Sequence, residues 1–393
     1  MIEKWTGAYR VGVSVQGVQA LVRRTHEARV LRVLREHGAL SRGQIATAAG
    51  LSRTTLSEIT GDLLSRGAVV VVDTDHHRRA GSGRPAELLT LDPSSGQFLG
   101  VDIGHTRVRI AVADAAHDII AAGHAKYGPD LDRGQRVEVA FALIDRVAAR
   151  TGVSFRALQG VGVGVAGPWP AAPDLAGMFG ERFGAPVIVD NNTRFAGLAE
   201  AITDGPDVHD VMYVRLSDGI GGGLVVGGRL VAGAGGAAGE FGHVTAQPGG
   251  DPCRCGKRGC LETVASIPAV LRSCARRGLA LATVQELEAA LGRGAPVAAE
   301  VLDAATAAVG RVVAVAALVL NPAQIVIGGR LPRSAPAFVR RVEETVAGEL
   351  CPAGGPRPAI RAARLGDGDG ALGAIAALFR QTPLLDGYPE PVR

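Results

Sequence analysis

Residues 99–114 read Leu-Gly-Val-Asp-Ile-Gly-His-Thr-Arg-Val-Arg-Ile-Ala-Val-Ala-Asp and indicate the fold of the larger part of the chain. Two apolar runs of strand length on either side of a glycine-containing turn predict a β-hairpin. Residues 211–226 repeat this arrangement as Val-Met-Tyr-Val-Arg-Leu-Ser-Asp-Gly-Ile-Gly-Gly-Gly-Leu-Val-Val. Because strands alternate with helical stretches such as 137–150 and 296–320, the sequence predicts an α/β domain.

Both turns carry residues found in phosphate-binding loops: Asp102, Gly104 and Thr106 in the first, and Asp218, Gly219 and Gly221 in the second. Glycine has no Cβ, so the backbone amides beside it can approach an anion closely. One such turn indicates little by itself. Two at corresponding places of similar hairpins predict a pair of phosphate loops.

The first ninety residues are organised differently, as short amphipathic helices followed by two strands. An opening helix precedes Ser41-Arg-Gly-Gln44, which has the spacing of a capping box. Ser52 is the predicted N-cap of the next helix. Strands at 69–73 and 87–91 on either side of a polar tip predict a wing. The sequence therefore predicts a winged helix-turn-helix domain, α-helical with a β wing, over residues 1–92.

The last helix and the wing of this domain are predicted to meet DNA. Short or bidentate side chains suit phosphate oxygens and base edges in a major groove, and a guanidinium in a wing suits a narrow minor groove. The predicted DNA contacts are Arg42, Arg53, Thr54, Thr55 and Ser57 on the helices, and Arg78, Arg79 and Arg84 in the wing. Winged helices also serve as protein–protein modules, and that alternative stays open here. Since one module reads only a few base pairs, operator binding would need a homodimer or a dimer of dimers.

The distribution of charge favours DNA as the partner. The net charge of the 393-residue chain is +4, and residues 1–92 hold 13 Lys and Arg against 9 Asp and Glu, whereas the remainder holds 29 of each sign. A basic unit joined to a neutral body is typical of a polyanion-binding module on another kind of domain. No apolar run of about 18 residues and no secretory leader pattern is seen, so we expect a cytoplasmic protein without a membrane partner.

Three of the five cysteines, Cys253, Cys255 and Cys260, fall within eight residues. In a reducing compartment clustered cysteines are more often metal ligands than disulfides. Three thiolates in a tight loop leave one place for a fourth ligand in a tetrahedral zinc site. The sequence therefore predicts a structural Zn²⁺.

Residues 93–393 resemble the ROK family (repressors, open reading frames and kinases), which has the two-lobed actin-like ATPase and sugar-kinase fold. The resemblance rests on ordered motifs at residues 102–106, 162–168, 189–192, 219–223, 239–243, 253–262 and 321–329. The N-terminal winged helix, with Gly83-Arg-Pro85 before the first body strand, resembles the repressor branch. The resemblance implies an effector cleft between the lobes and a zinc loop near residues 243–262, with His243 as the fourth ligand.

The resemblance also implies that kinase chemistry has been lost. In ROK kinases the general base is the Asp of an Asn-Asp pair, and the matching pair here is Asn191-Asn192. An amide cannot accept the proton of the attacking hydroxyl, and that assistance is typically worth ~10²–10⁴ in rate. His105 replaces a family glycine, and Asp218 would repel ATP if it faced the phosphates. We therefore expect no catalytic residue and no ATP.

The resemblance places five residues where the family hydrogen-bonds sugar hydroxyls: Asn191, Asn192, Glu240, His243 and Glu262. A sugar or sugar derivative is therefore the predicted effector of a sequence-specific DNA-binding regulator, a repressor of carbohydrate-related genes. Two alternatives stay open. In one, Glu240 and His243 only support the zinc loop of a regulator without a ligand. In the other, the protein is a bifunctional, ATP-dependent sugar kinase with an appended DNA-binding domain.

Overall fold

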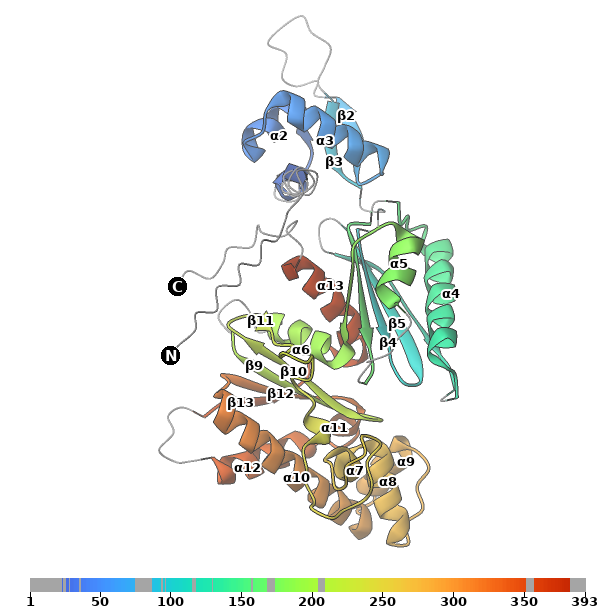
Figure 1. The fold of residues 1–393 in the computed structure, drawn as a ribbon, viewed down its shortest axis with the longest axis vertical. Coiled ribbons are helices and arrows are strands. Elements are labelled where there is room, and N and C mark those ends of the chain that lie inside the picture. The colour runs from blue at the N-terminus through green and yellow to red at the C-terminus, as the bar shows by residue number, and fades with distance from the viewer. Residues whose placement is uncertain are drawn as a thin grey trace, which may run out of the picture.

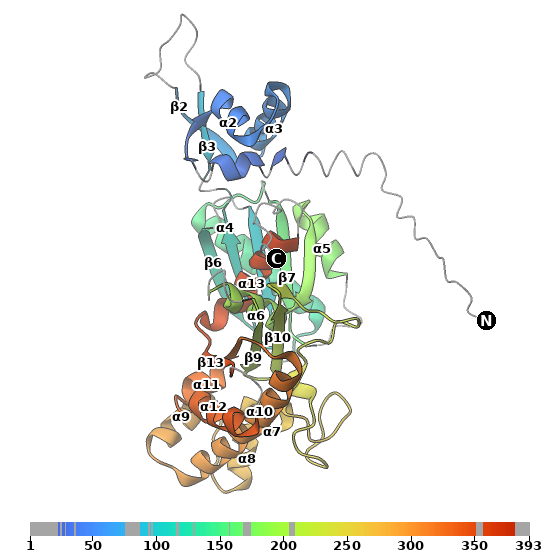
Figure 2. The same cartoon turned by 90° about the vertical axis from the view of Figure 1, so that its left-hand side faces the viewer.

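The structure is a computed structural model of the chain (Figure 1). It describes residues 23, 26–27, 29–34, 37–74, 87–92, 95, 97–114, 118–128, 130–156, 158–167, 174–203, 209–350 and 357–381. These residues form a small N-terminal domain and two lobes, each built on a five-stranded sheet (Figures 1 and 2). The wing tip, with the predicted DNA contacts Arg78, Arg79 and Arg84, lies outside the described residues.

The N-terminal domain contains the predicted helix-turn-helix. Its helix α2 (Arg42–Ala49) begins at Ser41, whose backbone N–H donates to the Gln44 side chain while its hydroxyl accepts from the Gln44 backbone, so the predicted capping box is present. Gly50 ends α2 with φ of 64°, a left-handed conformation that glycine adopts without strain. Ser52 caps α3 (Arg53–Ser65) as predicted, by accepting a hydrogen bond from the backbone of its third residue.

A three-stranded sheet completes this domain, in the order β1-β3-β2. Its strands are β1 (Leu40–Ser41), β2 (Val69–Thr74) and β3 (Glu87–Leu91). The antiparallel pairing of β2 with β3 is the predicted stem of the wing. Ile45, Leu56 and Leu89 are buried between the helices and this sheet, so the domain has a hydrophobic core of its own.

The first lobe is built on a sheet with the strand order β6-β5-β4-β7-β8. Its strands are β4 (Phe98–Ile103), β5 (Arg107–Ala113), β6 (Ile119–Lys126), β7 (Gly160–Val165) and β8 (Val187–Asn191). β4 pairs antiparallel with β5 and parallel with β7, so the first predicted hairpin is present. Two helices, α4 (Arg133–Thr151) and α5 (Leu175–Phe183), cover one face. Val101, Ile144 and Phe179 are buried beneath them.

The second lobe has a sheet with the order β11-β10-β9-β12-β13. Its strands are β9 (Val211–Leu216), β10 (Ile220–Val226), β11 (Arg229–Leu230), β12 (Gln324–Gly328) and β13 (Ala359–Ala362). The antiparallel pair β9–β10 is the second predicted hairpin. The elements beside this sheet are η1 (Phe241–His243), α7 (Glu262–Ala265), α8 (Ile267–Arg276), α9 (Val284–Gly292), α10 (Pro296–Leu320), α11 (Arg330–Ser334) and α12 (Phe338–Glu349).

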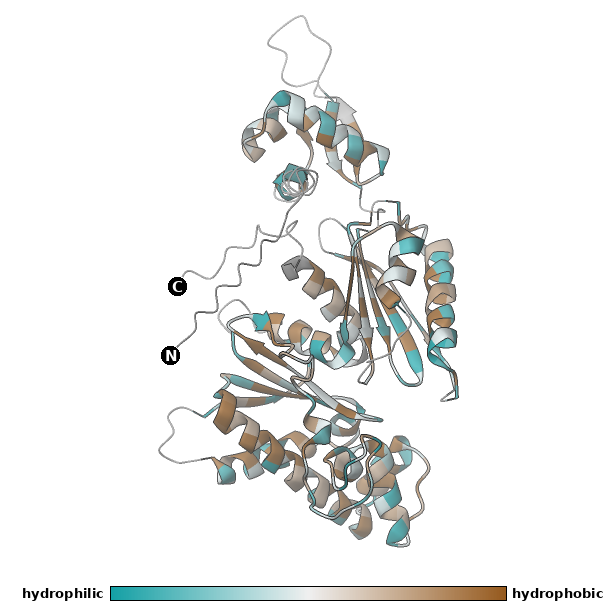
Figure 3. Ribbon diagram, viewed as in Figure 1, coloured by the Kyte–Doolittle hydropathy of each residue, from teal (hydrophilic) through white to brown (hydrophobic). Residues whose placement is uncertain are grey.

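Helix α10 is the most apolar long helix of this lobe (Figure 3). Within the described part of the chain it is the one helix whose length and composition would allow it to cross a membrane, with a window of mean hydropathy 1.8. However, 61% of that window is buried inside the protein. α10 therefore serves as the core helix of the second lobe.

Two helices, α6 (Asn192–Ile202) and α13 (Asp369–Gln381), lie between the sheets, and the short turn η2 (Gly366–Gly368) leads into α13 (Figures 1 and 2). α13 packs on the first sheet and α6 on the second, so the two lobes meet where these helices cross. At the crossing, a Cβ on Gly373 would lie 1.7 Å from the backbone oxygen of Phe195. The close approach of the helices therefore requires glycine at this position.

Candidate functional site

A cleft between the lobes is lined by the two predicted phosphate loops and by the first residues of α6 and α13. All six residues predicted for these loops line it: Asp102, Gly104, Thr106, Asp218, Gly219 and Gly221. Asn191 and Asn192 line it as well, because β8 ends and α6 begins there. The structure thus brings together loops that are about a hundred residues apart in the sequence, and phosphate binding by them stays a prediction.

The first loop is held in place by its own hairpin and by Tyr127. The Gly104 N–H donates to the Arg107 carbonyl oxygen (2.9 Å), which closes the turn between β4 and β5. The Tyr127 hydroxyl donates to the Gly104 carbonyl oxygen at 2.6 Å. These two hydrogen bonds hold the first loop on its hairpin.

Asn192 faces Asp102 inside the cleft. Its Nδ2 donates to Asp102 Oδ1 at 2.7 Å, and the two residues are 5% and 2% exposed. Burial raises the pKa of the Asp102 carboxyl, whereas the charge of Arg215 and the hydrogen bond from Asn192 oppose that rise. The Asn192 amide thus donates a hydrogen bond to a buried carboxyl. Unlike a carboxylate, the amide carries no negative charge and cannot accept a proton from a substrate hydroxyl.

A buried ion pair crosses the cleft from β9 to the start of α13. Arg215 pairs with Asp369, whose Oδ2 also accepts from the Tyr213 hydroxyl at 2.7 Å. Burial disfavours the charge of Arg215, but Asp369 and Tyr213 raise its pKa well above the usual value. Because breaking a buried pair leaves an uncompensated charge, this contact stabilises the present arrangement of the lobes.

Asp218 lines the cleft, as its place in the second predicted phosphate loop leads us to expect, but an ion pair compensates its negative charge. It forms an ion pair with Arg330, the first residue of α11, and the Arg330 backbone N–H donates to Ser217 Oγ at 3.0 Å. Repulsion of an anion by Asp218 is therefore weaker than the sequence alone suggests.

The predicted effector residues fall into three groups. Asn191 Nδ2 donates to Glu240 Oε1 (3.4 Å), and Glu240 Oε2 lies 4.0 Å from His243 Nε2, so these three form one chain of contacts. Asn192 faces Asp102 instead. Glu262 lies apart from both groups and contacts the second phosphate loop, where its Oε2 accepts from the Ile220 N–H at 3.0 Å.

Four residues in or beside the cleft were missed from the sequence: Arg215, Arg330 and Asp369, which line it, and Arg254, which lies next to it through its contact with Glu262. Arg254 stands between two of the clustered cysteines, and its Nε lies 2.8 Å from Glu262 Oε1, which ties the cysteine loop to the cleft. For Arg215 a signal was available, since it is a charged residue within an apolar strand. Arg330 and Asp369 carry no comparable local signal.

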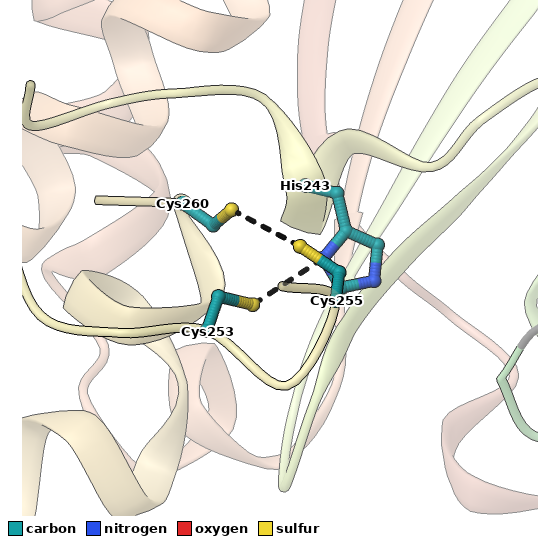
Figure 4. A group of neighbouring side chains, drawn as sticks. All are labelled: His243, Cys253, Cys255 and Cys260. Carbon is teal, nitrogen blue, oxygen red and sulfur yellow. Dashed lines mark hydrogen bonds between the residues drawn. The ribbon is translucent and has the colours of Figure 1, made fainter. Parts of the chain in front are cut away.

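The cysteine loop brings His243, Cys253, Cys255 and Cys260 together (Figure 4), with one ligand atom of each within 4.8 Å of all the others. The Cys253 sulfur lies 3.6 Å from His243 Nδ1, and the Cys255 and Cys260 sulfurs lie 3.6 Å apart. This distance is too long for a disulfide, whose sulfurs are about 2.05 Å apart. Three thiols and one imidazole in a compact group are a donor set that suits a tetrahedral metal site.

The recognition surface of the helix-turn-helix is partly as predicted. Arg53, Thr54 and Ser57 of α3 are exposed, and Thr55 is half-buried. Arg42, in contrast, forms an ion pair within the domain, in which its Nη1 lies 2.8 Å from Glu87 Oε2 of the wing stem. This ion pair favours a role for Arg42 in joining α2 to the wing, and its contact with DNA stays a prediction.

The exposed Arg53 provides a test of DNA binding. If Arg53 reads a base as predicted, replacing it with alanine is expected to weaken binding to DNA from upstream of the protein's own gene by about 1–3 kcal/mol, the value of one bidentate base contact. Fluorescence anisotropy measures the affinity. Arg340→Ala removes the same charge from an exposed pair in the ROK-like body and is the matched control. Equal affinities of the two variants would show that α3 does not read the operator.

The comparisons with known proteins decide the family. A family model described as "ROK family" matches residues 98–382. The chain belongs to the ROK family. A second model, described as "MarR family", matches residues 22–80, so a winged helix-turn-helix of the MarR type precedes the ROK domain. The resemblance and the fold class expected from the sequence are confirmed.

The curated relatives include repressors. The putative xylose repressor of Caldicellulosiruptor sp. (strain Rt8B.4) is 29% identical over 271 residues, which are 65% of this chain and 67% of the relative. The DNA-binding transcriptional dual regulator NagC of Escherichia coli K12 is 27% identical over 353 residues, 83% of this chain and 85% of NagC. With its MarR-type domain, this ROK protein is thus a transcriptional regulator, as the sequence predicted.

Kinases are also similar. The kanosamine kinase of Amycolatopsis mediterranei is 30% identical over 299 residues, which are 71% of this chain and 94% of the kinase. Among solved structures, a ROK family transcriptional regulator described as a homologue of the E. coli MLC protein superposes with a TM-score of 0.68 and 22% identity, over 93% of this chain and 98% of the other. That likeness shows the shared fold over both parts of the chain.

Proposed function

We propose that this ROK protein is a repressor of carbohydrate-related genes that binds operator DNA through α3 and the wing. A sugar or sugar derivative bound in the cleft changes the arrangement of the lobes and thereby the affinity for DNA. A ligand acts in this way only through its different affinities for the two arrangements. The observation that supports the proposal is the contact of Asn192 with Asp102, because the ROK resemblance assigns the kinase base to position 192 and an amide there cannot accept the proton.

The cleft is proposed to bind without catalysis. A carboxylate at position 192 would face Asp102 at hydrogen-bond distance, where two like charges oppose each other, whereas the amide donates to it. The amide therefore stabilises the cleft as a binding site at the expense of general-base chemistry. Glu240, which contacts Asn191, and His243, which lies 4.0 Å from Glu240, are the candidates for holding sugar hydroxyls.

Incubation of the purified protein with ATP, Mg²⁺ and a panel of hexoses, N-acetylhexosamines and pentoses tests this part. We expect no turnover above background, since general-base assistance alone is worth ~10²–10⁴ in rate. A coupled assay for ADP gives the readout, with a ROK sugar kinase as the positive control. Turnover of any sugar by the wild-type protein would contradict the proposal and favour the kinase reading.

The second candidate function, a bifunctional sugar kinase with a DNA-binding domain, is favoured by one specific observation, the similarity to a kanosamine kinase at 30% identity. A bifunctional protein would phosphorylate its sugar in the same cleft and bind DNA through the same winged helix. The two candidate functions differ in what they need at position 192. A kinase needs a general base there, whereas a binding cleft does not.

Zinc is the proposed metal of the cysteine loop. His243, Cys253, Cys255 and Cys260 supply all four ligands, so the ion would have a structural role and no open position for substrate. The loop also carries Arg254, which contacts Glu262 at the cleft, so the metal would fix that side of the effector site.

The assembly follows from DNA recognition. A single winged helix reads few base pairs, so we propose a homodimer or dimer of dimers that spans two half-sites in the cytoplasm. The proposed boundary between the DNA-binding domain (1–92) and the ROK domain (93–393) falls between the end of β3 at Leu91 and the start of β4 at Phe98.

A further inference from the structure

Cys255 is the exposed member of the proposed metal group. Cys253 and Cys260 are buried, and His243 is half-buried. An oxidant in solvent therefore meets the Cys255 sulfur before the other two. Disulfides that form in reducing compartments are usually transient and redox-sensing, and a sensor thiol is typically accessible and close to a second, resolving cysteine.

Cys260 is placed to be that second cysteine. Its sulfur lies 3.6 Å from the Cys255 sulfur, and Figure 4 shows the two sulfurs facing each other within the loop. A disulfide needs sulfurs about 2.05 Å apart, so they have to approach by about 1.5 Å. Because loops at the surface move more readily than buried elements, an approach of this size requires no unfolding of the ROK domain.

The Cys260 side of the pair is held in place by its backbone. The Leu261 N–H donates to the Val244 carbonyl oxygen at 2.8 Å, and the Gly259 carbonyl oxygen accepts from the Ala246 N–H at 2.8 Å. The residues on both sides of Cys260 are thus bound to one neighbouring segment, and Cys260 itself is fully buried. Closure of the disulfide therefore moves the exposed end of the pair.

Arg254 connects that exposed end to the cleft. It precedes Cys255, its Nε lies 2.8 Å from Glu262 Oε1, and its Nη2 donates to Glu262 Oε2 at 3.1 Å. Glu262 Oε2 also accepts from the Ile220 N–H at 3.0 Å, in the second predicted phosphate loop. A displacement of Cys255 therefore reaches the backbone of the cleft through two successive contacts.

We propose that Cys255 and Cys260 form a thiol-oxidation site, at which peroxide closes a disulfide, expels the metal and loosens the second loop of the cleft. This inference rests on the proposed zinc and goes beyond the proposed function, because it adds oxidation as a second input to a protein that responds to a sugar. With both sulfurs in a disulfide, only His243 and Cys253 are left of the four ligands, which is too few for a tetrahedral site.

The reaction consumes one peroxide molecule for each disulfide. The Cys255 sulfur attacks the O–O bond, which gives a sulfenic acid and one water. The Cys260 sulfur then attacks the sulfenic sulfur, so the S–S bond forms and the second water leaves. Two electrons pass from the sulfurs to the peroxide. The two protons in the waters come from the thiols, or from solvent where the sulfurs are thiolates that release Zn²⁺.

The test treats the zinc-loaded full chain with hydrogen peroxide, which catalase then removes. We expect the loss of one zinc per chain to a chromogenic chelator and a fall from five free thiols to three, both reversed by dithiothreitol and Zn²⁺. Peptide mapping identifies the pair, because trypsin cuts after Arg254, Lys257 and Arg258 and thereby places the three cysteines on separate peptides. The expected link joins the Cys255 and Cys260 peptides.

Hydrogen exchange at the Ile220 amide reports on the cleft without a ligand. Oxidation is expected to accelerate it about tenfold, since the hydrogen bond to Glu262 weakens. Arg254→Gln should accelerate the same amide in the reduced protein while the zinc stays bound, because it removes the ion pair and none of the ligands. Cys274→Ser is the matched control, and its zinc release and exchange should equal those of the wild type.

A disulfide between other cysteines would overturn this inference, as would oxidation of Cys255 to a sulfinic acid without a disulfide. Release of zinc with unchanged exchange at Ile220 would overturn its link to the cleft. A reduced protein without zinc would refute the proposed metal, and peptide mapping would still decide whether the two sulfurs join. The DNA binding and sugar response of the reduced protein test the proposed function separately.

Discussion

Replacement of Cys260 by serine is expected to abolish metal binding and to lower the free energy of unfolding of the ROK domain by on the order of 5 kcal/mol, because the binding free energy of a structural zinc is part of the folding free energy. Cys260 is fully buried beside the other three ligands. Elemental analysis of the purified protein gives the zinc content, and denaturant unfolding gives the stability.

Cys274→Ser is the matched control, since Cys274 is also fully buried but lies on α8, outside the ligand group. It introduces the same hydroxyl into the interior, which costs about 1–3 kcal/mol, and it should leave one zinc per chain. If the two variants lost equal stability, or if the wild-type protein contained no zinc, the account of this loop as a metal site would be wrong.

Gly373→Ala is expected to destabilise the junction of the lobes by roughly 4 kcal/mol or more, because the new methyl group meets backbone that cannot move aside cheaply. Its Cβ would lie 1.7 Å from the backbone oxygen of Phe195, so α6 and α13 would have to separate. These helices carry Asn192 and Asp369 into the cleft, and we therefore expect ligand binding to be lost together with stability. Thermal unfolding and calorimetry measure the two effects.

Gly348→Ala provides the comparison. Gly348 lies in α12, and no atom would lie within 4 Å of its added Cβ. Alanine is favoured over glycine in helices, so this variant should be stabilised by up to about 1 kcal/mol. A Gly373→Ala protein as stable as the wild type would mean that the helices can separate freely, and the lobes would then not be coupled through this crossing.

Much of the fold was predictable because its signals are local. The capping box at Ser41, the N-cap at Ser52 and the hairpin at 99–114 each depend on residues a few positions apart. β1 was not predicted, since a strand of two residues, Leu40–Ser41, leaves no pattern of alternation and forms only by pairing with β3.

The site was predictable only in part, because its decisive contacts are not local. Asn192 and Asp102 are 90 positions apart, and Arg215 and Asp369 are 154 apart, so no spacing rule reveals either pair. The resemblance to the ROK family identified Asn192 as the changed residue, but its partner is evident only from the structure, which places the first residue of α6 beside Asp102 of β4. The ion pair in which Arg330 compensates the charge of Asp218 could likewise not be predicted from the sequence, because the two residues are far apart in it.

The central claim is that ligand binding in a non-catalytic cleft controls the affinity for DNA. The most direct measurement is the affinity of the full chain for DNA from upstream of its own gene, titrated with and without a panel of sugars and sugar derivatives in the absence of ATP. The account predicts specific binding that weakens when one of these sugars or sugar derivatives is added, with the ligand recovered unchanged. Operator affinity that no sugar, sugar phosphate or sugar acid alters, or a ligand that is chemically converted, would contradict it.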